Sequence, residues 1–254
     1  MTQRWKLTIE YDGTDYCGWQ RQDNGMSVQQ AIEEAIYKFC GENAELVTAG
    51  RTDAGVHAMG QVAHVDIERI STFKEVRDAI NYHLGEHKVA ILNAEQVHPD
   101  FHARFDAAKR IYCYRILANR SADSVLNSKY LWHVKHDLDV DAMHQGAQYL
   151  LGMHDFSSFR ASECQAKTPM RSIDKISVVE VVNPLIPVGK YIEVWVEARS
   201  FLHHQVRNMV GTFKAVGDGK LKPEDIKTIL EGKDRKKAGE TAPAQGLHFV
   251  RVDY

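Results

Sequence analysis

Long hydrophobic segments and paired cysteines are both missing from this 254-residue sequence. No apolar run approaches the roughly 20 residues needed to span a bilayer, and no hydrophobic signal-peptide segment follows the first residues. The cysteines include no C-x-x-C pair, which argues against a zinc site and against a disulfide framework; they are Cys17, Cys40, Cys113 and Cys164. We therefore expect a cytoplasmic protein with no membrane contact.

Motifs that bind metals or phosphates are also lacking. His203 and His204 are adjacent, so on a helix their side chains would diverge by about 100°. No H-x-x-x-H or C-x-x-C pattern supports them as metal ligands. Residues 217–220 contain two glycines and a lysine, but they have neither the Walker spacing nor a preceding strand. The residues themselves thus predict no metal site and no phosphate-binding loop.

Charge of one sign is not in excess. The chain has 32 Lys and Arg against 34 Asp and Glu, a formal net charge of -2. Indiscriminate nucleic-acid binding requires many cations facing one polyanion, so this balance argues against it but leaves room for a local basic groove. With 44% hydrophobic and 26% charged residues, the composition is typical of a soluble globular protein of one large or two ordinary domains.

The first half of the chain shows clear hydrophobic periodicity. Alternation predicts a strand at 5–11, and apolar runs predict strands at 46–49, 62–65 and 89–97. Capping signals at Ser27 and at Thr72 with Glu75 open helices that end at Gly41 and Gly85. The order strand, helix, strand, strand, helix, strand is that of a split βαβ, or ferredoxin-like, unit.

The second half repeats this order without obvious sequence identity. Strands are expected at 111–117, 131–134, 173–182, 191–198 and 247–253, and a helix at 140–151. A further helix begins near Leu202, and Pro223 opens a shorter one. We expect an α+β protein of two ferredoxin-like halves, residues 1–105 and 106–254, whose mostly antiparallel sheets meet at a central cleft.

The most informative stretch is the polar turn at residues 50–58, which is bracketed by glycines and by apolar runs. Asp53 is expected at a strand end, where a rigid scaffold can aim its carboxylate. Arg51 lies two positions earlier, and in an extended turn its guanidinium could hold that carboxylate ionised. An ionised aspartate can be a nucleophile, a base or a metal ligand. The alternative is an ordinary turn in which Asp53 accepts backbone hydrogen bonds.

Two groups of cations accompany this turn. On the helix expected from Leu202, His203, Arg207 and Lys214 would form one cationic stripe, facing either a ligand or solvent. The strand at 109–115 interleaves Lys109 and Arg110 with two tyrosines. Tyr112 and Tyr114 point to one face, so a ring could stack on a base, although such tyrosines commonly serve packing alone.

Seven segments make the chain resemble one enzyme family, that of tRNA pseudouridine synthase A (TruA). They occur in the family's order along nearly the whole chain and are Tyr11–Thr14, Gly18–Gln22, Ala49–His57, Phe101–Phe105, Asp155–Arg160, Phe201–Gly211 and Ala242–Leu247. One such motif would be weak, but coincidence cannot explain all of them. The sequence departs from the family pattern where Ile111 and Cys113 flank Tyr112, since other members often carry arginine there.

The resemblance implies a function and a set of roles. Asp53 would be the catalytic aspartate, Tyr112 the tyrosine that contacts the substrate, and Arg207 the arginine that pairs with the aspartate. Arg51 would support the loop. The family isomerises uridine to pseudouridine in the anticodon stem-loop of tRNA, at positions 38 to 40, as a homodimer without metal or organic cofactor. RNA contacts are also expected from four further cations, namely His203, Lys214, Lys109 and Arg110.

Some alternatives stay open at this level. The sequence does not decide whether Asp53 attacks C1′, adds to C6 or removes a proton, or whether Tyr112 or Tyr114 faces the base. One rival function is a non-catalytic RNA-binding module with Asp53 as a turn residue. Another is a metal-dependent hydrolase that uses His57, His64 and Asp53.

Overall fold

A computed structural model describes residues 2–184 and 186–254, so Met1 of the first predicted domain and Leu185, between the strands predicted at 173–182 and 191–198, lie outside the described residues. The chain divides into two compact units. The first runs to Ala108 and includes His248–Tyr254, and the second is Lys109–Leu247. The first unit thus ends three residues beyond the predicted boundary, and it contains the last strand, which the prediction had assigned to the second half.

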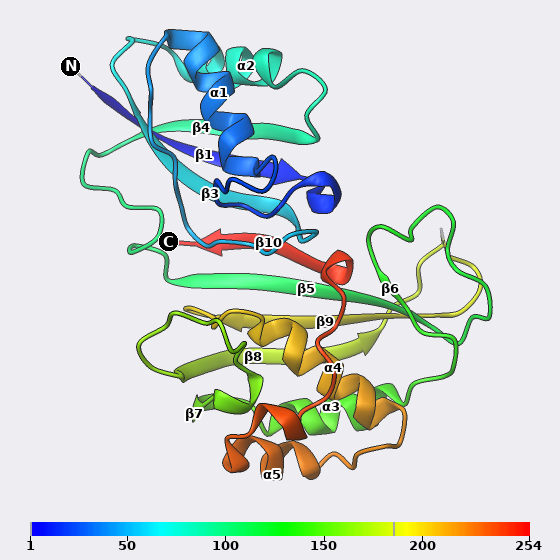
Figure 1. The fold of residues 1–254 in the computed structure, drawn as a ribbon. Helices are drawn as coiled ribbons and strands as arrows, with labels where there is room; N and C mark the ends of the chain where they lie inside the picture. The colour runs from blue at the N-terminus through cyan, green and yellow to red at the C-terminus, as the bar shows by residue number, and fades with distance from the viewer. Residues whose placement is uncertain (1, 185) are drawn as a thin grey trace. The chain divides into compact units, whose positions relative to one another are not determined.

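The first unit is built on long antiparallel strands (Figure 1). Strand β1 (Gln3–Tyr11) lies between β3 (His57–Ile67) and β4 (Val89–Val97), with Leu7 opposite Ala63 and Ala94. The other edge of β3 is shared. The short β2 (Val47–Thr48) pairs antiparallel with its second half, and β10 (Leu247–Asp253) pairs parallel with its start. The strands predicted at 89–97 and 247–253 are confirmed residue for residue.

Two capped helices accompany these strands, as predicted. Helix α1 (Val28–Cys40) begins after Ser27, whose side chain accepts the Gln30 amide, and ends at Gly41 in the left-handed conformation. Helix α2 (Phe73–Leu84) has a complete capping box between Thr72 and Glu75. The two helices pack against each other, and α2 packs on β4. Their apolar stripes and the alternate residues of β1 form the core, which includes the fully buried Trp5, Leu7, Ile9, Ile32 and Ile36.

The second unit, as described for residues 109–184 and 186–247, has its own antiparallel strands and three helices. The strand order is β5 (Lys109–Ala118), β9 (Lys190–Ala198), β8 (Met170–Glu180) and β7 (Gly152–Asp155), and β6 (Trp132–His133) pairs parallel with β5. Its helices are α3 (Val140–Gln148), α4 (Gln205–Gly217) and α5 (Asp225–Gly232). Short 3₁₀ segments occur in both units, at Gly13–Asp15, Ser157–Phe159, Arg235–Lys237 and Ala244–Gly246. The protein is therefore α+β with mostly antiparallel strands.

The helix boundaries in this unit differ from the prediction at α4 and α3, and one strand was not predicted. Helix α4 begins at Gln205 rather than near Leu202, because His204 takes the left-handed conformation with φ of 58°. Helix α3 ends at Gln148, and Gly152, at φ of 87°, starts the unpredicted strand β7. A left-handed residue interrupts the helical backbone, which requires negative φ. His203 consequently lies outside the helix, so the predicted stripe of His203, Arg207 and Lys214 on one helix face is wrong.

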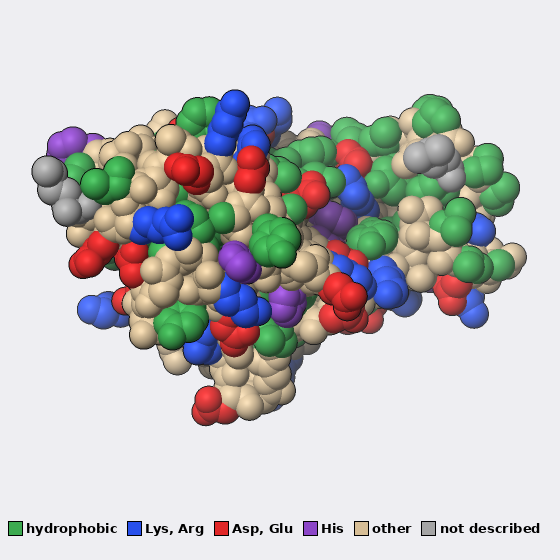
Figure 2. All heavy atoms as spheres, turned by 90° about the horizontal axis from the view of Figure 1, so that it is seen from above, with side chains coloured by type: hydrophobic (Ala, Val, Ile, Leu, Met, Phe, Trp, Pro, Cys, Tyr) green, Lys and Arg blue, Asp and Glu red, His purple; other side chains and the backbone are tan. Residues whose placement is uncertain are grey.

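On the face shown in Figure 2, the described Lys and Arg side chains are interspersed with Asp, Glu and hydrophobic ones. None of the helices in residues 2–184 and 186–254 has both the length and the apolar composition required to cross a membrane.

A buried histidine makes the first unit sensitive to acid. His64 is 5% exposed, and its Nδ1 accepts the Ala103 amide at 3.1 Å. Burial, with the positive charge of Arg4 nearby, lowers the pKa of His64 from 6.5 to about 4. The unfolded chain therefore binds a proton between those values that the folded chain excludes, and stability falls as the pH drops through this window.

We accordingly expect the melting temperature to fall between pH 6.5 and pH 4, and to fall less in His64→Gln, whose amide oxygen can still accept the Ala103 N–H. Thermal unfolding followed by circular dichroism across this range is the measurement. His83→Gln on α2 is the matched control and should show the wild-type pH dependence. Identical pH profiles for His64→Gln and wild type would contradict the assignment.

Candidate active site

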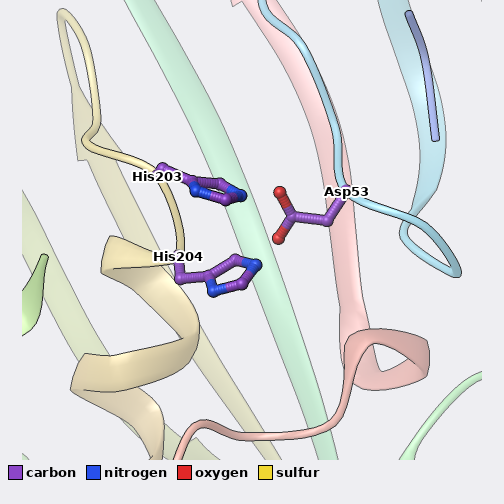
Figure 3. Close-up of side chains that lie close together, drawn as sticks. All are labelled: Asp53, His203 and His204. Atoms are coloured by element: carbon purple, nitrogen blue, oxygen red, sulfur yellow. The ribbon is translucent and has the colours of Figure 1, made fainter. Parts of the chain in front are cut away.

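Asp53 lies on the loop between β2 and β3, and Figure 3 shows its carboxylate leaving that loop. The side chain is partly exposed. The Asp53 carbonyl accepts the Val56 amide at 3.2 Å, which closes a turn immediately before β3 begins at His57. The carboxylate is thus carried by a short turn anchored on a long buried strand, as the glycine-bracketed pattern predicted.

Hydrogen bonds from buried residues hold the Asp53 loop in place. The Tyr11 hydroxyl lies 2.7 Å from Thr52 Oγ1, and the Gln61 side-chain amide donates to the Gly50 carbonyl at 2.7 Å. The Trp19 amide donates to the Thr52 carbonyl at 3.1 Å. A buried polar group that loses its hydrogen-bond partner costs free energy. These bonds therefore hold the residues on both sides of Asp53 in one conformation.

Two glycines allow the neighbouring backbone to approach the loop. A Cβ at Gly13 would lie 2.0 Å from the Val56 carbonyl oxygen. At Gly18, φ is 108° and a Cβ would lie 2.8 Å from the Thr52 carbonyl oxygen. Only glycine fits at these two positions, because it has no Cβ and because it readily adopts the positive φ found at Gly18. The family segments at 11–14 and 18–22 therefore have a structural reason, which is to cradle the Asp53 loop.

Arg51 does not take the position expected from its spacing. Its side chain is exposed, and within the described part of the first unit no ion pair joins its guanidinium to Asp53. The prediction assumed an extended backbone from Arg51 to Asp53. In the structure a turn closed by the Val56 amide begins at Asp53 itself.

Tyr11→Phe tests whether the buried bonds position the aspartate. Burial raises the pKa of Tyr11 to about 12, so its hydroxyl stays protonated and bonded to Thr52 at neutral pH. Removing it should cost about 1 kcal/mol of stability. If Asp53 has the catalytic role that the sequence resemblance implies, turnover on tRNA should fall about tenfold with unchanged tRNA affinity, since small displacements of a catalytic group reduce the rate. Tyr82→Phe, at an exposed position on α2, is the control, and equal rates for the two variants would contradict the positioning role.

In the second unit, the segment before α4 presents two imidazoles. The rings of His203 and His204 lie 4.0 Å apart by their centroids, and Figure 3 shows both projecting from this segment. The expectation that they diverge is wrong, because neither residue lies within the helix. The segment is anchored where the Ala161 amide donates to the His203 carbonyl at 3.1 Å and Gln205 Oε1 accepts the Leu202 amide at 2.8 Å. A protein metal site usually needs three or four ligands, so these two imidazoles do not by themselves form one.

Arg207 stands on the first turn of α4 and is partly exposed. Its Nε donates to the Ala242 carbonyl at 2.8 Å, and the Ala242 amide donates to the Arg207 carbonyl at 3.2 Å. The next residue, Asn208, donates to the Phe159 carbonyl at 2.9 Å and accepts from Arg235 at 2.9 Å. The segments around residues 155–160 and 235–242 therefore fix the turn that carries Arg207.

The two tyrosines of β5 have different surroundings. Tyr114 is completely buried, its hydroxyl donates to the Pro243 carbonyl at 2.7 Å, and burial raises its pKa well above the usual value. A Cβ at Gly246 would lie 2.5 Å from the Tyr114 ring. Tyr112 is 8% exposed and meets Phe201 edge-on, with the ring centroids 5.2 Å apart. Tyr114 is therefore a packing residue, which leaves Tyr112 as the candidate for base contact.

Lys214, the remaining cation of α4, is bound within its unit. Its Nζ lies 2.9 Å from Asp218 and 3.4 Å from Glu240, and its side chain is 11% exposed. It also lies 5.7 Å from the centroid of the Trp132 ring. Lys214 thus neutralises carboxylates at the far end of α4 from Arg207.

The two cations at the start of β5 also have partners in their unit. Lys109 lies 3.0 Å from Glu197 on β9. Arg110 is buried and donates to the Arg199 carbonyl. These contacts join β5 to β9 and to the chain beyond it.

The first unit does not assemble the metal-hydrolase alternative. His57 and His64 both lie on β3, seven positions apart, which at the rise of a strand is about 20 Å. The His57 ring stacks on His248 at 5.0 Å, and His64 accepts the Ala103 amide. One ion cannot reach both imidazoles.

The α+β fold with mostly antiparallel strands fits the pseudouridine synthase class of enzymes. A family model described as tRNA pseudouridine synthase matches residues 7–106 and 147–254. "tRNA pseudouridine synthase A" of Rhodospirillum centenum is 54% identical over 99% of this chain and 100% of its own length. The proteins of the same name from Paramagnetospirillum magneticum and Sinorhizobium fredii are 55% and 49% identical, over 99% of this chain and 95% and 99% of theirs. The chain belongs to the tRNA pseudouridine synthase A family, a family of isomerases.

Proposed function

We propose that this protein isomerises uridine to pseudouridine in the anticodon stem-loop of tRNA, at positions 38 to 40, with Asp53 as the catalytic residue. The observation that carries the proposal is the Asp53 loop. Two buried side chains and two glycine-dependent backbone contacts hold it, in a chain about half identical to relatives named for this activity.

The chemistry suits one fixed carboxylate. Isomerisation breaks the bond between C1′ and N1 of the nucleoside, turns the uracil and joins it again through C5. It consumes neither electrons nor phosphate energy, so we propose that no metal or organic cofactor takes part. The reaction requires an anionic group at C1′ or C6 and a site that retains the detached uracil. Asp53 provides that group as a nucleophile, by addition to C6, or as a base.

The other residues have supporting roles in this proposal. Tyr112 contacts the base, which must leave the stack at a cost of about a few kcal/mol. Arg207, fixed on its helix turn, and the exposed Arg51 bind the substrate, and His203 contacts the RNA from the segment before α4. Three further cations are proposed to contribute less to RNA binding, because each already contacts a carboxylate or a carbonyl group within its unit. They are Lys109, Arg110 and Lys214.

We further propose that each unit is a ferredoxin-like half. In the first unit the strands follow the order β4, β1, β3 with β2 on the edge of β3, and this arrangement supports that topology. A cytoplasmic homodimer completes the proposal. Size-exclusion chromatography with light scattering would give twice the 28.8 kDa chain mass for a dimer, and a monomeric mass would contradict it.

The test of the function is release of tritium from tRNA carrying uridine labelled at C5, which accompanies formation of the new bond there. Purified protein without added metal, and with a chelator present, should release the label. Mapping of modified positions in tRNA from a deletion strain, with and without this protein, identifies the uridines. If tRNA is bound but no label is released, the protein is a non-catalytic RNA-binding module.

Arg207→Ala tests the proposed substrate contact. The side chain can make charge-assisted bonds to the substrate, so its loss should weaken tRNA binding about tenfold and lower turnover together. The dependence of affinity on salt should also become shallower, since one cation fewer faces the RNA. Lys227→Ala on the exposed face of α5 is the control. An unchanged rate with unchanged salt dependence would place Arg207 outside the substrate site.

A further inference from the structure

Phe101–Phe105 is a family segment that the proposed reaction does not use. It lies in the first unit, after β4. Its last residue is Phe105, whose aromatic side chain is 67% exposed. The Phe105 ring lies on the His102 ring, with centroids 4.2 Å apart and an interplanar angle of 32°. The Arg104 guanidinium lies 5.8 Å from the Phe105 centroid. Single exposed aromatics are common, but this one belongs to an ordered stack with a cation beside it.

The turn that holds Phe105 is rigid. His102 Nδ1 accepts the amides of Arg104 and Phe105 at 3.2 and 3.3 Å, and the His102 amide donates to Asp106 at 2.8 Å. The Phe105 amide also meets the His102 carbonyl at 3.1 Å. These bonds fix the backbone and the imidazole, so Phe105 is presented to solvent without the entropy cost that ordering a flexible loop would add on binding.

The same turn is anchored beside the base of the Asp53 loop. Ala103 is fully buried and packs with Ala49 and Val62, and its amide donates to His64 at 3.1 Å. Ala49 precedes Asp53 by four residues, so their Cα atoms are at most about 14 Å apart. The exposed stack and the proposed catalytic carboxylate therefore belong to one rigid part of the first unit.

We propose that Phe105 is a stacking platform for an unpaired base of the tRNA substrate, a base close to the target uridine, with Arg104 at the adjoining phosphate. Proteins bind unpaired nucleotides by stacking bases on aromatic rings and placing cations at the backbone. Such stacking tolerates any base, so the platform would hold the RNA strand without selecting its sequence. The inference rests on the proposed function, because the RNA is the substrate of that reaction.

Phe105→Ala is the direct test, with unmodified tRNA transcript as the probe. We expect the dissociation constant to rise about tenfold. KM should rise in parallel, while the single-turnover rate at saturating tRNA is retained and the melting temperature does not change, since the side chain is mostly exposed. Phe105→Trp should restore binding, and its added indole fluorescence should be quenched when tRNA is bound.

Matched variants separate stacking from other effects. Phe105→Leu keeps an apolar side chain without a π face and should bind as weakly as Phe105→Ala. Tyr82→Ala removes a ring that is 81% exposed on α2 and should leave affinity unchanged. Arg104→Ala should reduce the slope of log affinity against log salt by about one, whereas Phe105→Ala should not alter it.

Two outcomes would overturn the platform. These are wild-type affinity in Phe105→Ala, or equal losses in Phe105→Ala and Tyr82→Ala. Failure of the proposed function is a separate result, because it appears as absence of tritium release by the wild-type protein. An active wild type with an unaffected Phe105→Ala variant would remove only the platform.

Discussion

Asp53→Asn should form no measurable pseudouridine and should still bind tRNA. The amide has the shape of the carboxylate, and the loop is held by bonds at Gly50, Thr52 and the Asp53 carbonyl, so the backbone should not move. The amide cannot act as a nucleophile or base. We expect turnover to fall by at least about 1,000-fold, equivalent to about 4 kcal/mol of transition-state stabilisation. Tritium release under single-turnover conditions measures it.

The control for this substitution is Asp23→Asn, which changes the net charge equally at an exposed position of the same unit. It should retain wild-type turnover. Filter binding should give Asp53→Asn a tRNA affinity within a few-fold of wild type, since the carboxylate contributes to the reaction and not to attraction of a polyanion. Residual turnover of Asp53→Asn within tenfold of wild type would rule out a nucleophilic or basic role.

Gly211→Ala should cause the largest loss of stability. Gly211 lies in the middle of α4, where a Cβ would stand 1.7 Å from the Glu240 carbonyl oxygen. The neighbouring chain is equally close, since a Cβ at Gly239 would lie 2.5 Å from the Gly211 carbonyl oxygen. The obstacle is backbone, so α4 and the 239–242 segment must separate. We expect a loss of about 3 kcal/mol or more, and a melting temperature lower by about 6 to 12 °C.

Gly232→Ala is the matched control, because nothing lies within 4 Å of its Cβ position at the end of α5. It should be neutral or slightly stabilising, since alanine favours helix more than glycine does. Thermal unfolding of both variants gives the comparison. Similar melting temperatures for the two would show that the close approach at Gly211 can relax. Turnover of Gly211→Ala should also fall, because the 239–242 segment holds Arg207 through Ala242.

The sequence was sufficient where structure depends on neighbouring residues. Both helix starts in the first unit follow from Ser27 and Thr72, whose side chains accept the amides three residues on. The long strands follow from alternation and apolar runs. The position of Asp53 on a loop leading into β3 follows from the glycine-bracketed turn.

The sequence was insufficient where distant segments decide the outcome. The left-handed backbone of His204 moves the start of α4, and the residue type alone does not signal it, because this conformation is uncommon for every residue other than glycine. The local environment of Lys214 is set by Asp218 and by Glu240, 26 residues away. Strand β7 has four residues at an edge and no alternation of burial that would reveal it.

The supporting residues of the site were missed as well, although their signal was present. Tyr11 and Gln61 appear as ordinary strand residues until their bonds to the Asp53 loop are seen. Gly13 and Gly18 lie within two of the segments that resemble the family, Tyr11–Thr14 and Gly18–Gln22. Glycines beside a polar turn indicate that another part of the backbone approaches closely. The sequence indicates that such glycines are needed, but only the fold shows which carbonyl group lies against each of them.

The membership of β10 in the first unit has a consequence for synthesis on the ribosome. Phe249 is fully buried, and the strand pairs with β3 at His57 and Ala58. These residues are translated after the whole second unit. The amino-terminal unit thus cannot acquire its complete native pairing when only its first 108 residues have been made, and the edge of β3 at His57 stays open until β10 has been translated. Emergence of β10, rather than emergence of the first half of the chain, is the event that completes this unit.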